Sequence, residues 1–344
     1  MILNNTFRIL VLAALCLGTS AGASAADGSY KKYLPQIHGN IRAKYEYSTT
    51  DDQSRFAVRN ARVKIGGYAL PMVDYLVQVD FSNYGKISLM DAYVRVAPVQ
   101  NLKIFLGQAR VPFSVDASRD LHQYFFSDLS CGAKYLGNLR SVGLKAGYTL
   151  PGTNLYFEGG VFNASNMADH QKWNKSMTYG IKANYALPFG LTPQVCFMSR
   201  KPDNGVRYNQ ADVSVSWGNK HWFFEGEYLY CHYTRSSFAD AHTYNLIADY
   251  GFDVRGKLIS RLSFRGRFDG MTAISNGVLN DEGRLTATYP ERKRITAGVR
   301  TSYVRGGASI DFLVNFEQYF YPDKIEKVTP ADNNRLVAMV IVHF

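Results

Sequence analysis

The chain has 344 residues, of which 46% are hydrophobic and 14% aromatic, and its 39 lysine and arginine residues outnumber its 28 aspartate and glutamate residues by 11. This length is enough for one large domain or two of medium size, and it excludes a peptide or mini-protein. After the first 25 residues there is no run of 18 apolar residues, the length that a helix needs to cross a bilayer. Membrane-spanning helices are therefore not expected.

Residues 1–25 have the pattern of a secretory signal peptide. Arg8 is followed by an apolar run over 9–17, and the small residues Ala23, Ser24 and Ala25 precede a cleavage site. We expect this segment to be removed on export, which leaves a short N-terminal segment over 26–35 before the first predicted strand.

The remaining chain shows the period-two alternation of β-strands and no long window with the helical period. The clearest window is 258–269, where apolar side chains such as Phe264 and Phe268 alternate with Arg265 and Arg267. Windows of this kind predict sixteen strands, in chain order at 36–48, 55–69, 72–82, 87–97, 101–109, 140–150, 155–163, 177–187, 193–200, 208–218, 221–232, 242–252, 258–269, 294–304, 308–318 and 334–344.

Strand length and connection length together predict a barrel. Strands of about ten residues match the apolar band of an outer membrane when tilted near 45°, whereas strands of soluble proteins more often have about five or six residues. Short connections rich in Pro, Gly and Asn, such as 69–72 and 97–101, alternate with long ones such as 110–139 and 270–293. We predict an all-β fold, a sixteen-stranded antiparallel transmembrane β-barrel over 36–344 with short periplasmic turns and long extracellular loops. A soluble sandwich or propeller is the competing interpretation.

The last predicted strand departs from the pattern. Val337, Met339 and Ile341 are apolar, as are the residues between them, so alternation does not assign a lipid face there. The terminal aromatic residue Phe344 is the feature that supports a strand at this position.

Four segments carry a resemblance to a known family. They are 59–67 (RNARVKIGG), 75–81 (YLVQVDF), 91–94 (DAYV) and 107–114 (GQARVPFS), and they resemble the phosphate-selective porin O and P family. The last segment is the most specific, and the likeness is good over 36–150 and diffuse afterwards. The resemblance implies a sixteen-stranded, trimeric outer-membrane channel whose third loop, 110–139, folds into the lumen as a constriction. It also implies basic side chains that guide anions.

The third loop mixes charges of both signs. Its basic residues Arg110, Arg119 and Lys134 are our candidates for the constriction, but Asp116, Asp120 and Asp128 lie in the same loop. The family's selectivity depends on an arginine-rich constriction, so the resemblance alone does not imply phosphate as the solute.

The alternation also predicts which charged residues face the lumen. Slipping 258–269 by one residue would turn three arginines toward lipid, at about 2 to 4 kcal/mol each near the midplane. Closure of the barrel would bring the first two strands near the thirteenth and fourteenth, and so gather a basic arc opposite acidic residues. Such an arc favours anions. The alternative role for a single basic residue is to solvate the wall or to tie down a loop. The expected basic lining is Arg42, Lys44, Arg62, Lys64, Arg261, Arg265, Arg267 and Arg300.

Outside the predicted signal peptide, where 18–22 matches a nucleophile-elbow spacing by chance, no catalytic, cofactor or metal motif is found in the sequence. Cys231 and His232 point to opposite faces of a strand and cannot share an ion, and Cys131, Cys196 and Cys231 do not form a disulfide pattern. We expect a porin in the outer membrane of a Gram-negative bacterium, a passive channel that favours small anions such as phosphate. Its expected partners are lipid, small anionic or neutral solutes and two further copies of itself, with no nucleic acid. The alternatives are a non-selective general or oligosaccharide porin, and an outer-membrane β-barrel enzyme or adhesin.

Overall fold

The structure is a computed structural model that describes residues 33–83, 85–167, 172–256, 259–322 and 328–344. The predicted signal peptide and most of the segment 26–35 lie outside the described residues.

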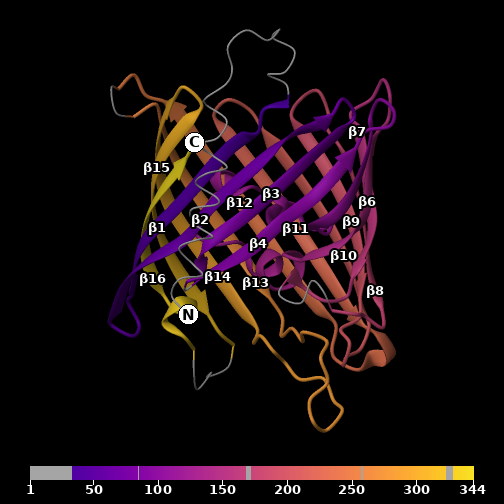
Figure 1. Ribbon diagram of the computed structural model, residues 1–344. Coiled ribbons are helices and arrows are strands. Elements are labelled where there is room, and N and C mark those ends of the chain that lie inside the picture. The colour runs from indigo at the N-terminus through magenta and orange to yellow at the C-terminus, as the bar shows by residue number, and fades with distance from the viewer. Residues whose placement is uncertain (1–32, 84, 168–171, 257–258, 323–327) are drawn as a thin grey trace, which may run out of the picture.

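Sixteen antiparallel strands form a closed barrel in which each strand pairs with its neighbours in sequence and β1 pairs with β16 (Figure 1). The predicted fold class is confirmed, and every predicted strand is present with bounds that differ by at most three residues. The strands are β1 (Gln36–Ser48), β2 (Gln53–Leu70), β3 (Val73–Asn83), β4 (Lys86–Val96), β5 (Leu102–Arg110), β6 (Arg140–Thr149), β7 (Leu155–Asn163), β8 (Met177–Tyr185), β9 (Leu191–Arg200), β10 (Tyr208–Gly218), β11 (Trp222–Tyr233), β12 (Ala241–Asp253), β13 (Arg261–Met271), β14 (Arg292–Arg305), β15 (Ala308–Phe320) and β16 (Arg335–His343).

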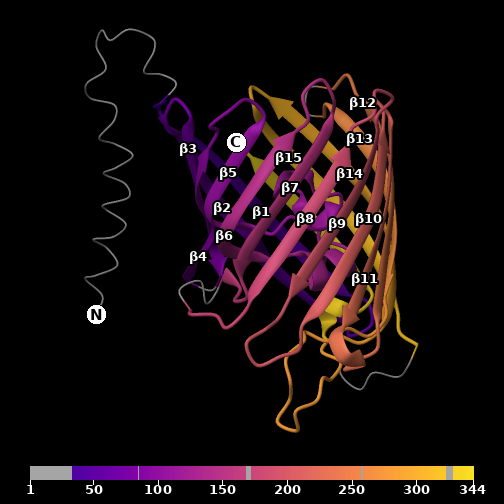
Figure 2. The same cartoon turned by 90° about the vertical axis from the view of Figure 1, so that its right-hand side faces the viewer.

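The two ends of the barrel differ in their connections. Figures 1 and 2 show short turns at the end where β1 begins and β16 ends, and longer loops at the opposite end. In an outer-membrane barrel the short turns are periplasmic and the long loops extracellular. The short helices η5 (Thr234–Ser236) and η6 (Pro330–Asp332) belong to extracellular loops. Within the described ranges, no helix has the length and apolar character needed to cross a membrane.

The seam between β1 and β16, where the barrel closes, includes a close contact between Gly39 and Phe344. The two residues exchange main-chain hydrogen bonds, with N···O distances of 2.7 and 3.1 Å. The ring of Phe344 lies so close to Gly39 that a Cβ on Gly39 would lie 2.2 Å from the ring Cζ. A side chain at position 39 would therefore displace the terminal ring from the first strand.

The irregular last strand is explained by what lies inside the barrel. Met339 and Ile341 are buried on the inner side, where they pack with Leu313 of β15, and Val337 is fully buried as well. The short helix η2 (Leu121–Gln123) lies against β16. Apolar residues face inward here because the chain, rather than water, covers this part of the wall.

Candidate functional site

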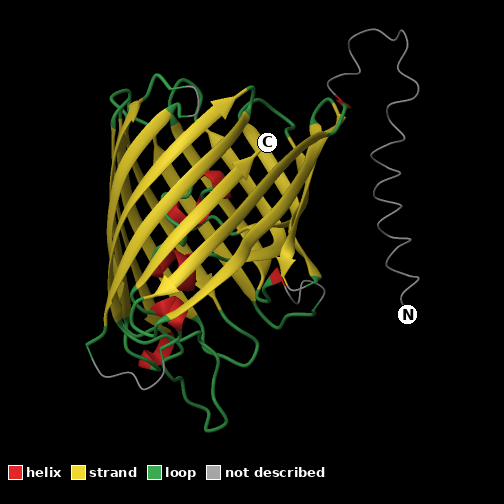
Figure 3. Cartoon of the chain, turned by 90° about the vertical axis from the view of Figure 1, so that its left-hand side faces the viewer, coloured by secondary structure: helices red, strands yellow, loops and turns green. Residues whose placement is uncertain are grey.

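The segment 111–139, which connects β5 to β6, lies inside the barrel. Figure 3 shows its helical turns surrounded by the strands. These turns are α2 (Val115–Ser118), η2 and η3 (Ala133–Gly137). We call this segment the inner loop.

The Gly-Gln pair before the inner loop fixes the end of β5. The side-chain amide of Gln108 donates to the carbonyls of Leu89 and Met90 at 2.5 and 2.9 Å, at the position where the pairing of β3 and β4 shifts by a residue. Gly107 has φ of 133°, and a Cβ there would lie 2.3 Å from the carbonyl oxygen of Ala92. The pair therefore allows β5 to pack tightly on an irregular part of β4.

The Pro-Phe-Ser part of the same motif turns the chain into the lumen. Phe113 is buried in an apolar cluster with residues of β7, β9 and β11. Ser114 has a positive φ of 58°, donates its hydroxyl to Oε1 of Glu227 on β11 at 2.7 Å, and accepts a bond from the amide of Ala117 at 3.2 Å. The motif thus attaches the beginning of the inner loop to the far wall.

Arginines from β1, β13 and β14 hold the middle of the inner loop. This stretch lacks regular hydrogen bonding, so its main-chain carbonyls need donors, and a guanidinium group offers five. We call these residues the arginine ladder; its members are Arg42, Arg265, Arg267, Arg294 and Arg300. The donor–acceptor pairs are Arg300 with His122 and Tyr124, Arg265 with Phe125, Arg42 with Ser127, Arg267 with Asp128, and Arg294 with Leu129, at N···O distances between 2.6 and 3.3 Å.

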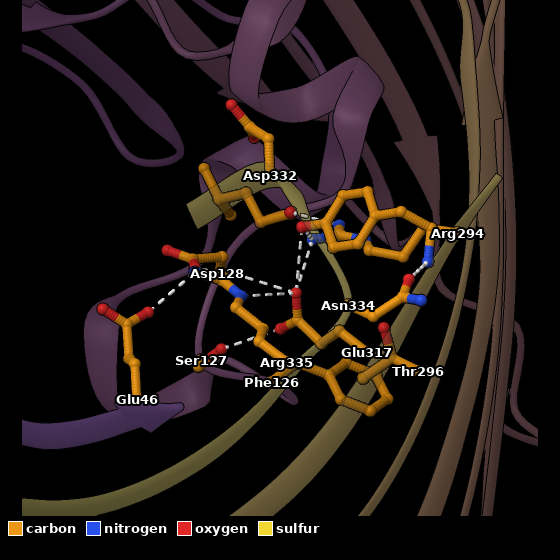
Figure 4. A network of polar contacts seen from close by, with 12 residues as sticks. Glu46, Phe126, Ser127, Asp128, Arg294, Thr296, Glu317, Asp332, Asn334 and Arg335 are labelled. Carbon is orange, nitrogen blue, oxygen red and sulfur yellow. Dashed lines mark hydrogen bonds and ion pairs between the residues drawn. The ribbon is translucent and has the colours of Figure 1, made fainter. Parts of the chain in front are cut away.

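Buried carboxylates balance the charge of the ladder (Figure 4). Glu317 accepts from Arg294 at 3.3 Å and from Arg335 at 3.0 Å, and Asp269 accepts from Arg294 at 2.9 Å. A buried ion pair is tolerated when each charge keeps its partners, whereas removal of one partner leaves a costly isolated charge. The network is therefore a structural unit whose members depend on one another.

Asp128 joins the inner loop to this network. Its carboxylate lies 2.7 Å from Nη2 of Arg335 and 3.3 Å from Nε of Arg59. Burial alone would raise the pKa of Asp128, but Lys44, Arg335 and Arg59 outweigh burial and hold that pKa well below its usual range. Asp128 is thus an anionic anchor for the middle of the loop.

The structure places much of the expected basic lining beneath the inner loop. Arg42, Lys44, Arg265 and Arg267 are each less than 9% exposed, so the expectation that they line open water needs correction. The reason is that these side chains donate to main-chain carbonyls of the inner loop or lie beside the carboxylate of Asp128. Arg300 lies in the same ladder.

Other expected site residues lie elsewhere. Arg261 is at the periplasmic end of β13, where it bonds to Asp253 at 3.2 Å. Arg119 pairs with Asp116 at 2.7 Å and with Glu225 of β11. Lys134 lies 3.6 Å from Asp332 in an extracellular loop. Arg119 and Lys134 are therefore both neutralised by acidic neighbours. Arg110 lies at the end of β5, and within the described chain its buried Nη1 has no hydrogen-bond partner.

The wall from β2 to β8 remains more accessible. The side chains of Arg59, Lys64 and Arg95 are 45%, 35% and 30% exposed. Salt bridges between strands include Arg62 with Asp80 at 2.7 Å. Basic residues on this wall include Arg59, Arg62, Lys64, Arg95, Lys103, Arg110, Arg140, Lys145 and Lys182, and acidic ones include Asp74, Asp80, Asp91 and Glu158. Arg62, Arg140, Lys145 and Lys182 are paired with these carboxylates and are at most 13% exposed. We call it the open wall.

Sequence reasoning missed Arg59 and Arg335 as inner residues. Arg59 is the extra residue of a β-bulge, since the pairing of β1 with β2 skips it between Asn60 and Val58, and strict alternation cannot find such a residue. Arg335 begins the strand in which alternation is lost. The cost of a charge facing lipid was the available indication that Arg335 points inward.

The described residues contain no group of three or more His, Cys, Asp or Glu side chains arranged to hold a metal ion. The buried Cys131, Cys196 and Cys231 are all free thiols. Cys131, in the inner loop, has its pKa raised to about 12 by burial and by Asp269, so it is not a reactive thiolate.

A closed barrel of sixteen antiparallel strands that is apolar outside and holds a folded loop between charged walls is the architecture of an outer-membrane porin. The family model for phosphate-selective porin O and P matches residues 35–230, more than half of the chain, and the chain belongs to this family. It is therefore a passive channel in the outer membrane of a Gram-negative bacterium.

Solved porins share the fold at low sequence identity. The anion-selective porin from Comamonas acidovorans is 11% identical with a TM-score of 0.63, and the match covers 90% of this chain and 98% of that one. The outer membrane channel DcaP of Acinetobacter baumannii is 14% identical with a TM-score of 0.61, covering 93% and 100%. OmpF of Salmonella typhi, in complex with daunomycin, is 14% identical with a TM-score of 0.61, covering 91% and 98%. No curated protein sequence matches the chain.

Proposed function

We propose that this porin favours small anions such as phosphate over cations, and that neutral solutes pass according to size. The observation that carries the proposal is the open wall, where basic residues outnumber acidic ones and the side chains of Arg59, Lys64 and Arg95 are 30% to 45% exposed. Accessible Arg and Lys side chains along a pore raise the local concentration of anions and favour their passage.

The inner loop, 110–139 in the predicted bounds, is proposed to be the constriction. It is attached to β11 through Ser114 and to β1, β13 and β14 through the arginine ladder. Because the loop covers these strands, solutes pass along the open wall. Arg110 is the strongest constriction candidate because its buried guanidinium keeps an unsatisfied donor that can bond to an anion.

The proposal includes a homotrimer in a lipid bilayer, made from a chain whose residues 1–25 are cleaved as a signal peptide. Support for the trimer comes from the porin fold, since OmpT of Vibrio cholerae, which is 10% identical with a TM-score of 0.58, was solved in a trimer form. No catalytic step is proposed, because the family and the similar structures are channels.

Reversal potentials in a potassium chloride gradient across a planar bilayer test the anion preference. We expect an anion-selective potential for the purified protein, and a shift toward the cation side in Arg59→Gln combined with Arg110→Gln. The matched control is Arg305→Gln, because Arg305 is exposed beside a periplasmic turn and its loss should leave the potential unchanged. A cation preference of the unmodified channel would refute the proposal.

A further inference from the structure

A cavity of about 150 Å³ lies inside the barrel near its periplasmic end, between the inner loop and the first strands. One water needs roughly 10 to 15 Å³ on this measure, so the cavity has room for a solute of several non-hydrogen atoms. Its polar lining consists of His38, Asn40, Arg62, Lys64, Gln78, Asp120, His122 and His343.

The register of the sheet creates this lining. His343, Asn40 and Arg62 are directly paired across β16, β1 and β2, and in the next inward-facing row His38, Lys64 and Gln78 are paired across β1, β2 and β3. Because residues two apart on a strand share a face, both rows point to the same side. The inner loop then covers them with Asp120 and His122.

Three imidazole rings stack along one side of the cavity. The rings of His122 and His343 lie 4.4 Å apart at 14°, and those of His343 and His38 lie 6.3 Å apart at 15°. The Nδ1 atom of His343 contacts the carbonyl of Gly39 at 3.2 Å. Parallel rings do not converge on a metal ion, but they offer a flat surface and several nitrogen donors.

Asn40 is the second, independent indication of a ligand. It is 8% exposed, and among the residues that the structure places, neither its amide oxygen nor its amide nitrogen has a hydrogen-bond partner. A buried amide with both atoms unsatisfied costs free energy. A ligand that presents one donor and one acceptor would remove that cost.

The charges favour an anion of low valence. Lys64 is half-buried and only loosely paired, with its Nζ 3.8 Å from Asp120, while Arg62 is bonded to Asp80 at 2.7 Å. Burial lowers the pKa of His122, and so do His343, Arg300 and Lys64, while Asp120 opposes them. Lys64 is therefore the lining cation whose charge is least closely paired, and the carboxylate of Asp120, which is 55% exposed, repels a dianion and accepts bonds from hydroxyl groups.

We propose that this cavity binds a small monocarboxylate that carries hydroxyl groups, with its carboxylate on Lys64 and its hydroxyls on Asn40 and Asp120. The stacked histidines form the wall against which its carbon chain packs. This inference rests on the proposed channel function, because such a solute reaches the site through the pore.

Single-channel recording with gluconate as the probe tests the site. Gluconate should interrupt the potassium chloride current of the unmodified channel, and Lys64→Met should raise the half-blocking concentration by about tenfold or more, since a charge-assisted bond is lost. Asn40→Leu should do the same. Lys103→Met, which removes the same charge on β5 outside the cavity, should leave the block unchanged.

The outcomes separate this site from the anion preference of the pore. An unchanged half-blocking concentration in both Lys64→Met and Asn40→Leu overturns the proposal, and so does an equally strong block by phosphate or by neutral glucose. If Asn40→Leu fails to assemble, Lys64→Met decides alone. A cation-selective reversal potential together with gluconate block that Lys64→Met relieves would refute the proposed selectivity and leave this site standing.

Discussion

The two halves of the inner wall carry the same residue types but use them differently. On β13 and β14, arginines face inward and are buried against main-chain carbonyls and carboxylates. On β2 and β4, Arg59, Lys64 and Arg95 also face inward but remain 30% to 45% exposed. The comparison teaches that strand position determines which way an arginine points, while the covering loop determines whether it meets water.

The largest expected effect comes from the covered half. Arg294→Ala should destabilise the barrel by about 3 to 5 kcal/mol, because it leaves Asp269 and Glu317 buried with fewer partners. The temperature at which the folded protein loses its characteristic gel mobility measures this. Arg95→Ala is the matched control on the open wall, where loss of a partly exposed pair with Asp74 should cost at most about 1 kcal/mol. Equal losses of stability in Arg294→Ala and Arg95→Ala would contradict the distinction between the covered half of the inner wall and the open wall.

The attachment of the inner loop to β11 is the next test. Ser114→Ala removes the donor to Glu227 and the cap of α2, and we expect a loss of about 1 to 3 kcal/mol. Open-channel current noise should rise as the loop loosens. Ser118→Ala provides a control in the same loop, because that hydroxyl bonds only to nearby carbonyls. Quiet current in Ser114→Ala would show that this anchor is dispensable.

Acidification should release the middle of the inner loop only under strongly acidic conditions. The folded-state pKa of Asp128 lies well below its usual range, so its stabilising contribution is complete above the unfolded-state pKa of about 3.9 and is lost as pH falls through the folded value. Current noise should therefore stay constant from neutral pH to about pH 4 and increase below it. Asp128→Asn should be noisy at every pH; a quiet Asp128→Asn channel would exclude this anchor.

The smallest structural effect, and a clear functional one, is expected on the open wall. Arg59→Gln should cost at most about 1 kcal/mol, because the side chain is 45% exposed and Asp128 keeps Arg335 as a partner, yet it should reduce the preference for chloride in reversal-potential measurements. Arg267→Gln should disturb stability and leave the preference nearly unchanged, since its guanidinium bonds to the loop. If Arg267→Gln lowered the preference for chloride and Arg59→Gln did not, solutes would pass along the arginine ladder instead of the open wall.

The sequence predicted the strands and their two faces better than it predicted the contacts of the inner loop. The alternation of Phe264 and Phe268 with Arg265 and Arg267 was sufficient to assign both faces of β13, because a charge facing lipid is costly. It failed at Arg59, where a bulge adds a residue, and it could not foresee that the carbonyls of residues 122–129 would bond to the arginines.

The sequence by itself determined the sixteen strands, the closed barrel and the position of the long third loop. The reason is that the membrane sets the length of each strand, and the difference between its lipid face and its inner face imposes a period of two that is visible in the local sequence. Only the tertiary structure decided which inward charges are covered and which contact water. It also decided that His38, His122 and His343, far apart in sequence, stack beside an unsatisfied Asn40. The physical reason is that the path of the inner loop depends on partners supplied by distant strands, which no local pattern encodes.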